Sequence, residues 1–330
     1  MRPRRRPSLP EKGRAIRKEF KELVSVIIPA YREEKMIGKT AETIAGILQR
    51  ENIPYELLFV DDGSTDATWE EIRAASERDG CVRGIHFSRN FGKESAMFAG
   101  LEKAKGDCCV VIDCDLQHPP EKIVEMVRLW EQGYEVVEGI KEDRGDETGT
   151  HRLAAKSFYA MISRAVGWDM SSASDFKLLD RKVVDVLNAM PERNVFFRAL
   201  SYWVGFRKAE VRYCVQERTV GESKWSTRAL IRYAITNITS FSAMPLHSIT
   251  VLGIAMLVIS LVFSLIALVQ KICGQAAEGF TTVILLLLFT GSVIMLSLGV
   301  IAYYIGKMYE ELKGRPRYII AEECGGEHDR

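Results

Sequence analysis

Two long stretches without a charged residue lie near the C-terminal end of this 330-residue chain. They run from Ile249 to Val269 and from Phe280 to Gly306. As a helix, each is long enough to cross the roughly 30 Å hydrocarbon layer of a membrane. The alternative is a pair of buried core helices, but helices of soluble proteins keep a polar face and these stretches have none. The sequence therefore predicts a C-terminal two-helix transmembrane hairpin.

The charges around the hairpin predict its orientation. The connection at residues 270–279 is short and holds one lysine and one glutamate. Basic residues lie instead outside the two stretches, at Arg228, Arg232, Lys307, Lys313, Arg315 and Arg317. Positively charged flanks stay on the cytoplasmic side. We therefore expect a protein of the cell membrane with two spans, whose large N-terminal part and both termini are cytoplasmic.

Overall composition excludes some partners. Lysine and arginine together number 45, against 44 for aspartate and glutamate. Bulk charge therefore gives no reason to expect nucleic acid as a partner. Residues 1–20 are strongly basic and predict a flexible tail, either solvated or resting on an anionic membrane surface. The seven cysteines show no CxxC spacing, which argues against a zinc site and favours reduced thiols in the cytosol.

Between Leu23 and Lys141, apolar β-branched runs alternate with helical stretches. This alternation predicts βαβ units and an α/β domain with a mostly parallel sheet. Ligands of such sheets bind at the carboxyl ends of the strands. Two of the predicted strands end in acidic residues, at Asp61–Asp62 and at Asp113–Asp115, so both acidic ends are expected in one crevice.

Beyond Lys141 the pattern is less regular, with a further helix and strand predicted. Residues 227–246 are amphipathic and lead into the first apolar stretch, which favours an interfacial helix. The expected organisation is a basic tail (1–20), a cytoplasmic domain (21–226), the interfacial helix (227–246), the hairpin (247–306) and a cytoplasmic tail (307–330).

Asp113 and Asp115 direct two carboxylates to one place. Like charges repel, so a positive group is expected beside them. With Gln117 nearby, they suit a hard divalent cation, Mg²⁺ or Mn²⁺, that keeps some waters and shares oxygens with a phosphate. The chain has no GxxxxGK[ST] loop and no GxGxxG after the first strand. This argues against a P-loop site and against a dinucleotide cofactor.

Six motifs occur in order: SVIIPAYREE, VDDGSTDAT, SRNFGKESAMFAGLEKAKGD, DCDLQHPP, SDFKLLDR and RTVGESKW. Together, from Leu23 to Trp225, they resemble glycosyltransferase family 2. Within it they are most similar to the polyprenyl-phosphate glycosyltransferases, which include dolichyl-phosphate mannose synthases and bacterial bactoprenol glucosyltransferases. The resemblance implies a GT-A-like nucleotide-sugar-binding domain, and the hairpin is similar to that of the bacterial type.

The resemblance also implies a donor site. It assigns the base and ribose of a nucleotide sugar to residues after the first two strands, namely Pro29, Tyr31, Glu33, Val60 and Asp62. It assigns Asp113 to the nucleotide, beside Cys114, which stands where alanine is usual and offers mainly backbone. The metal falls to Asp115, Gln117 and Asp113. Arg218 and Lys224 are similar to a basic pair that grips the diphosphate.

The acceptor side follows by the same resemblance. Arg144 and Arg152 match basic positions of the family's acceptor loop. Arg198 is a further candidate for the acceptor phosphate, or an interfacial residue. Asp175 is similar to a carboxylate near the reacting centre, so Asp115 and Asp175 are the catalytic candidates. Asp175 could orient the sugar, act as a base, or cap the segment that follows it.

These roles imply a metal-dependent enzyme that moves a sugar from a nucleoside-diphosphate sugar, expected to be a UDP-hexose, to polyprenyl phosphate in the membrane. One alternative is a GDP-mannose-dependent enzyme like the dolichyl-phosphate mannose synthases. A polysaccharide synthase is disfavoured because none of the five tryptophans belongs to a QxxRW motif. A non-catalytic scaffold is disfavoured by the intact acidic residues. The sequence leaves the sugar and a homo-oligomeric state open.

Overall fold

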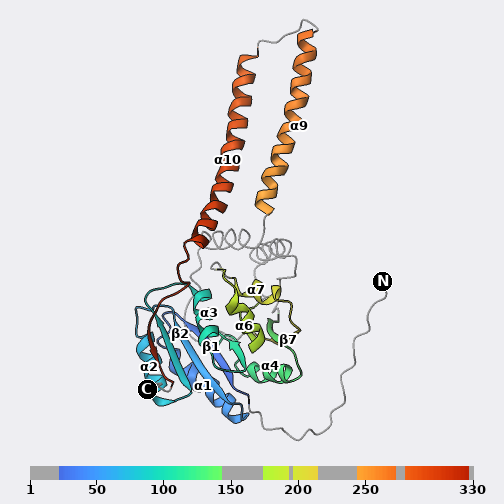
Figure 1. Ribbon diagram of the computed structural model, residues 1–330. Helices are drawn as coiled ribbons and strands as arrows, with labels where there is room; N and C mark the ends of the chain where they lie inside the picture. The colour runs from blue at the N-terminus through green and yellow to red at the C-terminus, as the bar shows by residue number, and fades with distance from the viewer. Residues whose placement is uncertain (1–21, 143–173, 193–195, 215–243, 273–278, 327–330) are drawn as a thin grey trace, which may run out of the picture.

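The computed structural model describes residues 22–142, 174–192, 196–214, 244–272 and 279–326 (Figure 1). In this part of the chain, eight strands form one sheet in the order β7-β5-β6-β4-β1-β2-β3-β8. The strands are β1 (Val24–Ala30), β2 (Tyr55–Asp61), β3 (Val82–Phe87), β4 (Cys108–Val111), β5 (Val136–Lys141), β6 (Lys177–Asp180), β7 (Lys208–Tyr213) and β8 (Ile320–Cys324). The helices are α1 (Ile37–Arg50), α2 (Thr68–Arg78), α3 (Lys93–Lys103), α4 (Lys122–Glu131), α6 (Arg181–Ala189), α7 (Phe197–Trp203), α9 (Met244–Ile272) and α10 (Phe280–Leu312).

The sheet is mixed but mostly parallel. β1 pairs in parallel with β2 and β4, β2 with β3, and β5 with β7. β6 runs antiparallel between β4 and β5, and β8 runs antiparallel to β3. The predicted α/β class with a mostly parallel sheet is therefore confirmed.

Helices cover both faces of the sheet, so β1 and β2 are buried at every position. Side chains alternate between the faces along a strand. Val26 and Ile28 join the cluster formed with α1, α2 and α4, whereas Ile27 joins the cluster formed with α3, α6 and α7. This double cover explains why the central strands are continuous apolar runs in the sequence.

The last strand of the sheet comes from the far end of the chain. After α10 the backbone returns to the α/β domain, and β8 pairs with the edge strand β3 (Figure 1). The expected division into a domain at 21–226 and a separate tail at 307–330 missed this strand.

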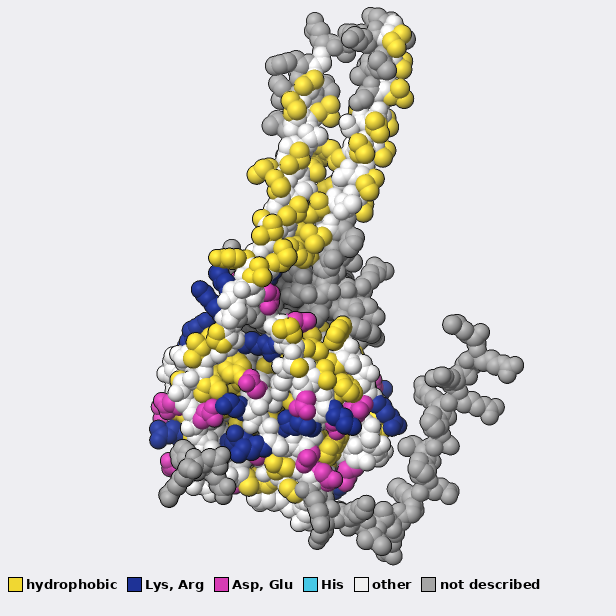
Figure 2. All heavy atoms as spheres, in the orientation of Figure 1, with side chains coloured by type: hydrophobic (Ala, Val, Ile, Leu, Met, Phe, Trp, Pro, Cys, Tyr) yellow, Lys and Arg dark blue, Asp and Glu magenta, His cyan; other side chains and the backbone are white. Residues whose placement is uncertain are grey.

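The two predicted apolar stretches form the long helices α9 and α10, which extend from the α/β domain (Figure 1). Hydrophobic side chains cover much of their visible surface (Figure 2). Within the described residues, one stretch, Phe289–Leu312, is apolar and long enough to cross a membrane, and Ser248–Phe263 is a shorter apolar helix. Two membrane crossings therefore remain a proposal. Most of the expected interfacial helix at 227–246 lies outside the described residues.

Gly100 tests how tightly α3 packs against β1. A Cβ atom at Gly100 would lie 2.2 Å from Cγ2 of the buried Ile27, whereas one at Gly46 in α1 would meet nothing within 4 Å. We expect Gly100→Ala to lower the free energy of unfolding by about 1–3 kcal/mol through overpacking. Gly46→Ala should leave it unchanged or raise it by about 0.5–1 kcal/mol. Thermal unfolding of the two purified variants measures the difference, and equal melting temperatures would contradict this packing.

Candidate active site

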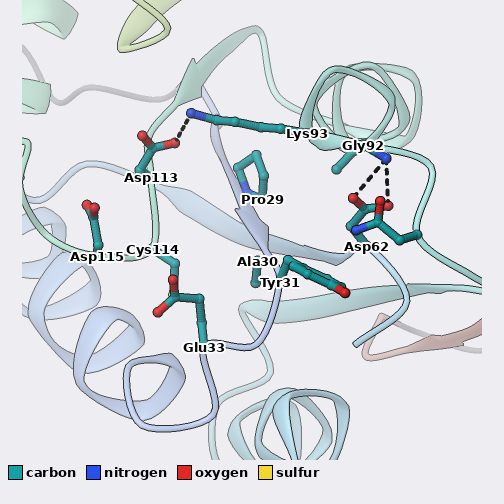
Figure 3. Close-up of a pocket in the computed structure, with 12 residues that line it drawn as sticks. Pro29, Ala30, Tyr31, Glu33, Asp62, Gly92, Lys93, Asp113, Cys114 and Asp115 are labelled. Atoms are coloured by element: carbon teal, nitrogen blue, oxygen red, sulfur yellow. Dashed lines mark hydrogen bonds and ion pairs between the residues drawn. The ribbon is translucent and has the colours of Figure 1, made fainter. Parts of the chain in front are cut away.

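A pocket of about 380 Å³ opens where β1, β2 and β4 end (Figure 3). Ligands of open α/β sheets bind in this kind of crevice. Its walls come from the loops after these strands, from the loop between β3 and α3, and from the start of α3. The lining residues are Pro29, Ala30, Tyr31, Glu33, Asp62, Asn90, Gly92, Lys93, Ala96, Asp113, Cys114 and Asp115.

The loop after β1 is held by the loop after β2. The Arg32 backbone is left-handed, with φ 59°, and its amide donates to Ser64 Oγ at 2.9 Å. The Glu33 amide donates to Thr68 Oγ1, also at 2.9 Å. Tyr31, which lines the pocket, is 41% exposed. An exposed ring in this place can stack on a flat ring of a ligand.

Asp62 ties the opposite wall to the sheet. Its side chain is buried, and its Oδ1 accepts from the Phe91 amide at 2.6 Å while Oδ2 accepts from the Gly92 amide at 2.9 Å (Figure 3). Burial raises the pKa of Asp62, and the two amide donors only partly offset it. Gly92 has φ 98°, a conformation that favours glycine. The carboxylate thus fixes the turn that leads into α3.

Four charged side chains form a chain of ion pairs at the pocket. Lys93 Nζ lies 2.6 Å from Asp113 Oδ1 and 3.0 Å from Asp175 Oδ2. Arg198 donates to both oxygens of Asp175, from Nε at 2.7 Å and from Nη2 at 2.9 Å. These residues meet because β4 and β6 are antiparallel neighbours, so the end of β4 lies beside the start of β6. The positive group expected next to Asp113 thus includes Lys93.

The ion pairs keep both aspartates charged. Burial alone would raise their pKa values, but the Lys93 ammonium holds the pKa of Asp113 well below its usual range, with a smaller contribution from His118. Lys93 and Arg198 do the same for the pKa of Asp175. Burial also opposes the charge on Lys93, yet the two carboxylates outweigh it and raise the pKa of the ammonium. A carboxylate held this way is a weak base.

The residues predicted to bind metal offer hard oxygen ligands but only part of a coordination sphere. Asp115 Oδ1 accepts from the backbone amide of Gln117 at 3.0 Å, and Asp113 is paired with Lys93. Among the described residues, no three His, Cys, Asp or Glu side chains converge on one point as a metal site. Asp115 and Glu33 both line the same pocket (Figure 3). This partial set fits Mg²⁺ or Mn²⁺ that takes its other ligands from waters and phosphate oxygens.

The structure brings most of the predicted donor residues together. The ones that line the pocket are Pro29, Tyr31, Glu33, Asp62, Asp113, Cys114 and Asp115. Val60 is fully buried in β2, packs with Phe87 and Ala96, and is not a lining residue. Four predicted basic residues lie outside the described part of the chain: Arg144, Arg152, Arg218 and Lys224.

Sequence reasoning missed two features of the site. One is Lys93, whose position directly after the Gly92 turn was an available signal. The other is a buried charge network behind Asp175. Lys177 Nζ lies 3.0 Å from Glu138 Oε1 with both side chains buried, and Glu138 also accepts from the Ser174 amide at 3.0 Å and from the Tyr202 hydroxyl. This network fixes the backbone that presents Asp175.

Comparison with known proteins identifies the family. Residues 25–187 match glycosyl transferase family 2. A protein of Bacillus subtilis (strain 168), named as an uncharacterised glycosyltransferase, is 38% identical over 308 residues, covering 93% of this chain and 95% of its own length. The chain belongs to glycosyl transferase family 2. The resemblance seen in the motifs is thereby confirmed, and this family 2 chain is an enzyme that transfers sugars.

Two further similarities extend the comparison of this glycosyltransferase. A prophage bactoprenol glucosyl transferase homologue of Escherichia coli (strain K12) is 34% identical, covering 90% of this chain and 98% of its own length. Among solved structures, glucosyl-3-phosphoglycerate synthase of Mycobacterium tuberculosis has a TM-score of 0.48 and 21% identity, covering 66% of this chain and 79% of its own.

Glu94 makes the stability of this glycosyltransferase depend on pH. Burial, followed by the charge of Asp175, raises the pKa of Glu94 to about 7. In the unfolded chain the carboxyl ionises near 4.3, so as pH rises from about 4.5 to 7 only the unfolded state gains by losing the proton, and stability falls. Glu94→Gln cannot ionise and escapes this loss. Between pH 5 and pH 8, we expect the free energy of unfolding of Glu94→Gln to rise by about 1–3 kcal/mol relative to that of the wild type.

Thermal unfolding at both pH values measures this gain. Glu125→Gln, on the exposed face of α4, is the matched control and should follow the wild type. If the free energies of unfolding of Glu94→Gln and the wild type differed by the same amount at pH 5 and pH 8, the raised pKa of Glu94 would be contradicted.

Proposed function

We propose that this enzyme transfers a sugar from a nucleoside-diphosphate sugar to polyprenyl phosphate, giving a polyprenyl-phosphate-linked monosaccharide. The observation that carries the proposal is the pocket where β1, β2 and β4 end. There Tyr31, Glu33 and Asp115 line the same pocket as Lys93 and Asp113, and Lys93 is ion-paired with both Asp113 and Asp175. Such a pocket offers a stacking ring and oxygen ligands for the diphosphate's cation.

The donor is held by parts with distinct tasks. Tyr31 stacks on the base, and the wall fixed by Asp62 holds the ribose. Asp115, with Gln117 and Asp113 nearby, would hold Mg²⁺ or Mn²⁺. Such an ion, when bound, neutralises charge that develops on the leaving diphosphate. Arg218 and Lys224 are proposed to add donors to the same phosphates. We propose a UDP-hexose as donor because relatives at 34% identity are named glucosyl transferases.

The acceptor is proposed to be a lipid phosphate. Relatives named bactoprenol glucosyl transferase align with 90–92% of this chain, including the region of α9 and α10. The two helices would cross the membrane as a hairpin, with the α/β domain on the cytoplasmic side, where Arg144, Arg152 and Arg198 position the acceptor phosphate. Arginine suits this task because its fork of donors matches phosphate oxygens.

The chemistry needs no strong general base. A phosphate monoester has its second pKa near ~6, so at neutral pH it is already a nucleophile. Asp175 accepts hydrogen bonds from Arg198 and lies in an ion pair with Lys93. Its role is then to hold these two cations in place beside the sugar and the acceptor.

A transfer assay tests the function. The full-length enzyme in nanodiscs is given undecaprenyl phosphate, Mg²⁺ or Mn²⁺, and in turn UDP-glucose, UDP-galactose, UDP-N-acetylglucosamine and GDP-mannose. We expect one UDP-hexose to give a glycolipid, detected by mass spectrometry, with matching release of UDP. Asp115→Asn should lower the rate by about 10²-fold or more while keeping its melting temperature. The control variant Glu131→Gln, which changes an exposed ion pair on α4, should keep the wild-type rate. Transfer from GDP-mannose alone would refute the UDP assignment, and no lipid product from any donor would refute the proposal.

Asp175→Asn separates a positioning role from a base. If Asp175 positions Lys93 and Arg198, the variant loses rate moderately, and its rate still rises with pH through the acceptor ionisation near ~6. If Asp175 were an essential base, Asp175→Asn would lower the rate about 10²–10⁴-fold. The ionisation of Asp175 would then also be missing from the pH–rate profile of the variant. The measurement is a pH–rate profile of both proteins at saturating metal, with the chemical step limiting. A loss in the larger range, with acceptor bound and ionised, would refute the positioning role.

A further inference from the structure

The segment that follows α10 packs against the end of β3 and against α3. After Leu312 the backbone turns at Gly314, which has φ 62°, and continues into β8 on the edge of β3 (Figure 1). The Ser88 amide, just after β3, donates to the carbonyl of Ile319 at 3.0 Å. The same segment therefore joins the end of the long helix α10 to the loop between β3 and α3.

Tyr318 is the central contact of this segment. Its ring stacks on Phe87, with centroids 5.0 Å apart and planes 10° from parallel. Phe87 in turn meets Phe91 edge to face, with centroids 5.8 Å apart. The Tyr318 hydroxyl donates to Glu102 of α3, and the Ser95 hydroxyl donates to the carbonyl of Arg317 at 3.4 Å. Tyr318 thus contacts Phe87, directly before the 88–92 loop, and the far end of α3, while its neighbour Arg317 contacts Ser95 in the first turn of α3.

The 88–92 loop forms one wall of the pocket. Asn90 and Gly92 line it, and the amides of Phe91 and Gly92 donate to Asp62. A continuous path of contacts therefore runs from Tyr318 through Phe87 and Phe91 to Asp62. Tyr318 itself is not among the lining residues.

We propose that Tyr318 is a positioning residue for the donor: from the segment after α10, it braces the 88–92 loop so that Asp62 and the pocket wall are set to receive the nucleotide sugar. The inference rests on the proposed donor site. It means that the segment C-terminal to α10 helps to hold a wall of the donor site in place. The expected consequence is weaker donor binding, not weaker acceptor binding, when the ring is lost.

The rest of the segment serves as an internal comparison. Glu323 of β8 forms an exposed ion pair with Lys103 at 2.8 Å. Glu323 lies in the strand that follows Tyr318, where it is paired with Ile85 and not with Phe87. A variant at Glu323 therefore perturbs the segment without removing the proposed brace.

The experiment compares Tyr318→Ala, Tyr318→Phe and Glu323→Gln in the full-length enzyme in nanodiscs. Tyr318→Ala should raise KM for the nucleotide sugar about 2- to 10-fold, the range that one aromatic pair corresponds to, with KM for undecaprenyl phosphate unchanged. Tyr318→Phe keeps the stack and should have the wild-type KM for the nucleotide sugar. Glu323→Gln should have the wild-type KM for both substrates. If Tyr318→Ala fails to fold, Tyr318→Leu, which keeps an apolar side chain without the stack, takes its place.

Hydrogen exchange of the peptide covering residues 88–92, measured without donor, decides the brace independently. Faster exchange in Tyr318→Ala, with wild-type exchange in Tyr318→Phe, supports the brace. This result does not depend on catalysis. If the wild type transfers no sugar, the proposed function is refuted and the brace is not. Unchanged exchange, or equal changes in both KM values, would overturn the inference.

Discussion

The geometry of the site depends on the Lys93 ammonium between Asp113 and Asp175. The two carboxylates are neighbours because β4 and β6 are adjacent and antiparallel. Without a cation they would repel, and one of them would take up a proton. Lys93, at 2.6 Å and 3.0 Å, lets both stay charged. The start of α3 is thereby bound to the segment just after β4 and to the segment just before β6, and the pocket wall next to it is fixed.

Much of this could be predicted from the sequence, where local patterns decide. The buried strands β1 to β4 are apolar runs between helical stretches, and acids at their ends mark the crevice, as Asp62 and Asp113 do. Lys93 was missed because a lysine in the first turn of a helix is usually a solvated charge, and only the fold brings it to Asp113. The short helix α7 was missed because its seven residues show too little periodicity.

β8 was missed for a different reason. Its five residues are partly exposed and carry two glutamates, so they lack the alternation that marks a strand. What makes them a strand is the unpaired edge of β3, far away in the sequence. The division of the chain into an α/β domain and a membrane part is accordingly incomplete, because a domain ending at residue 226 would leave that edge exposed.

The same ion pairs explain why the proposed donor needs cations beyond those already in the pocket. Asp113 and Asp175 carry two negative charges, and Lys93 and Arg198 carry two positive ones. This group is balanced, so it adds little net attraction for a diphosphate. The charge of the donor has to be met by cations that are not committed to these carboxylates. A divalent ion on Asp115 and the basic residues of the RTVGESK motif are the candidates that the chain offers. The balanced group would then set geometry, and the added cations would stabilise the leaving diphosphate.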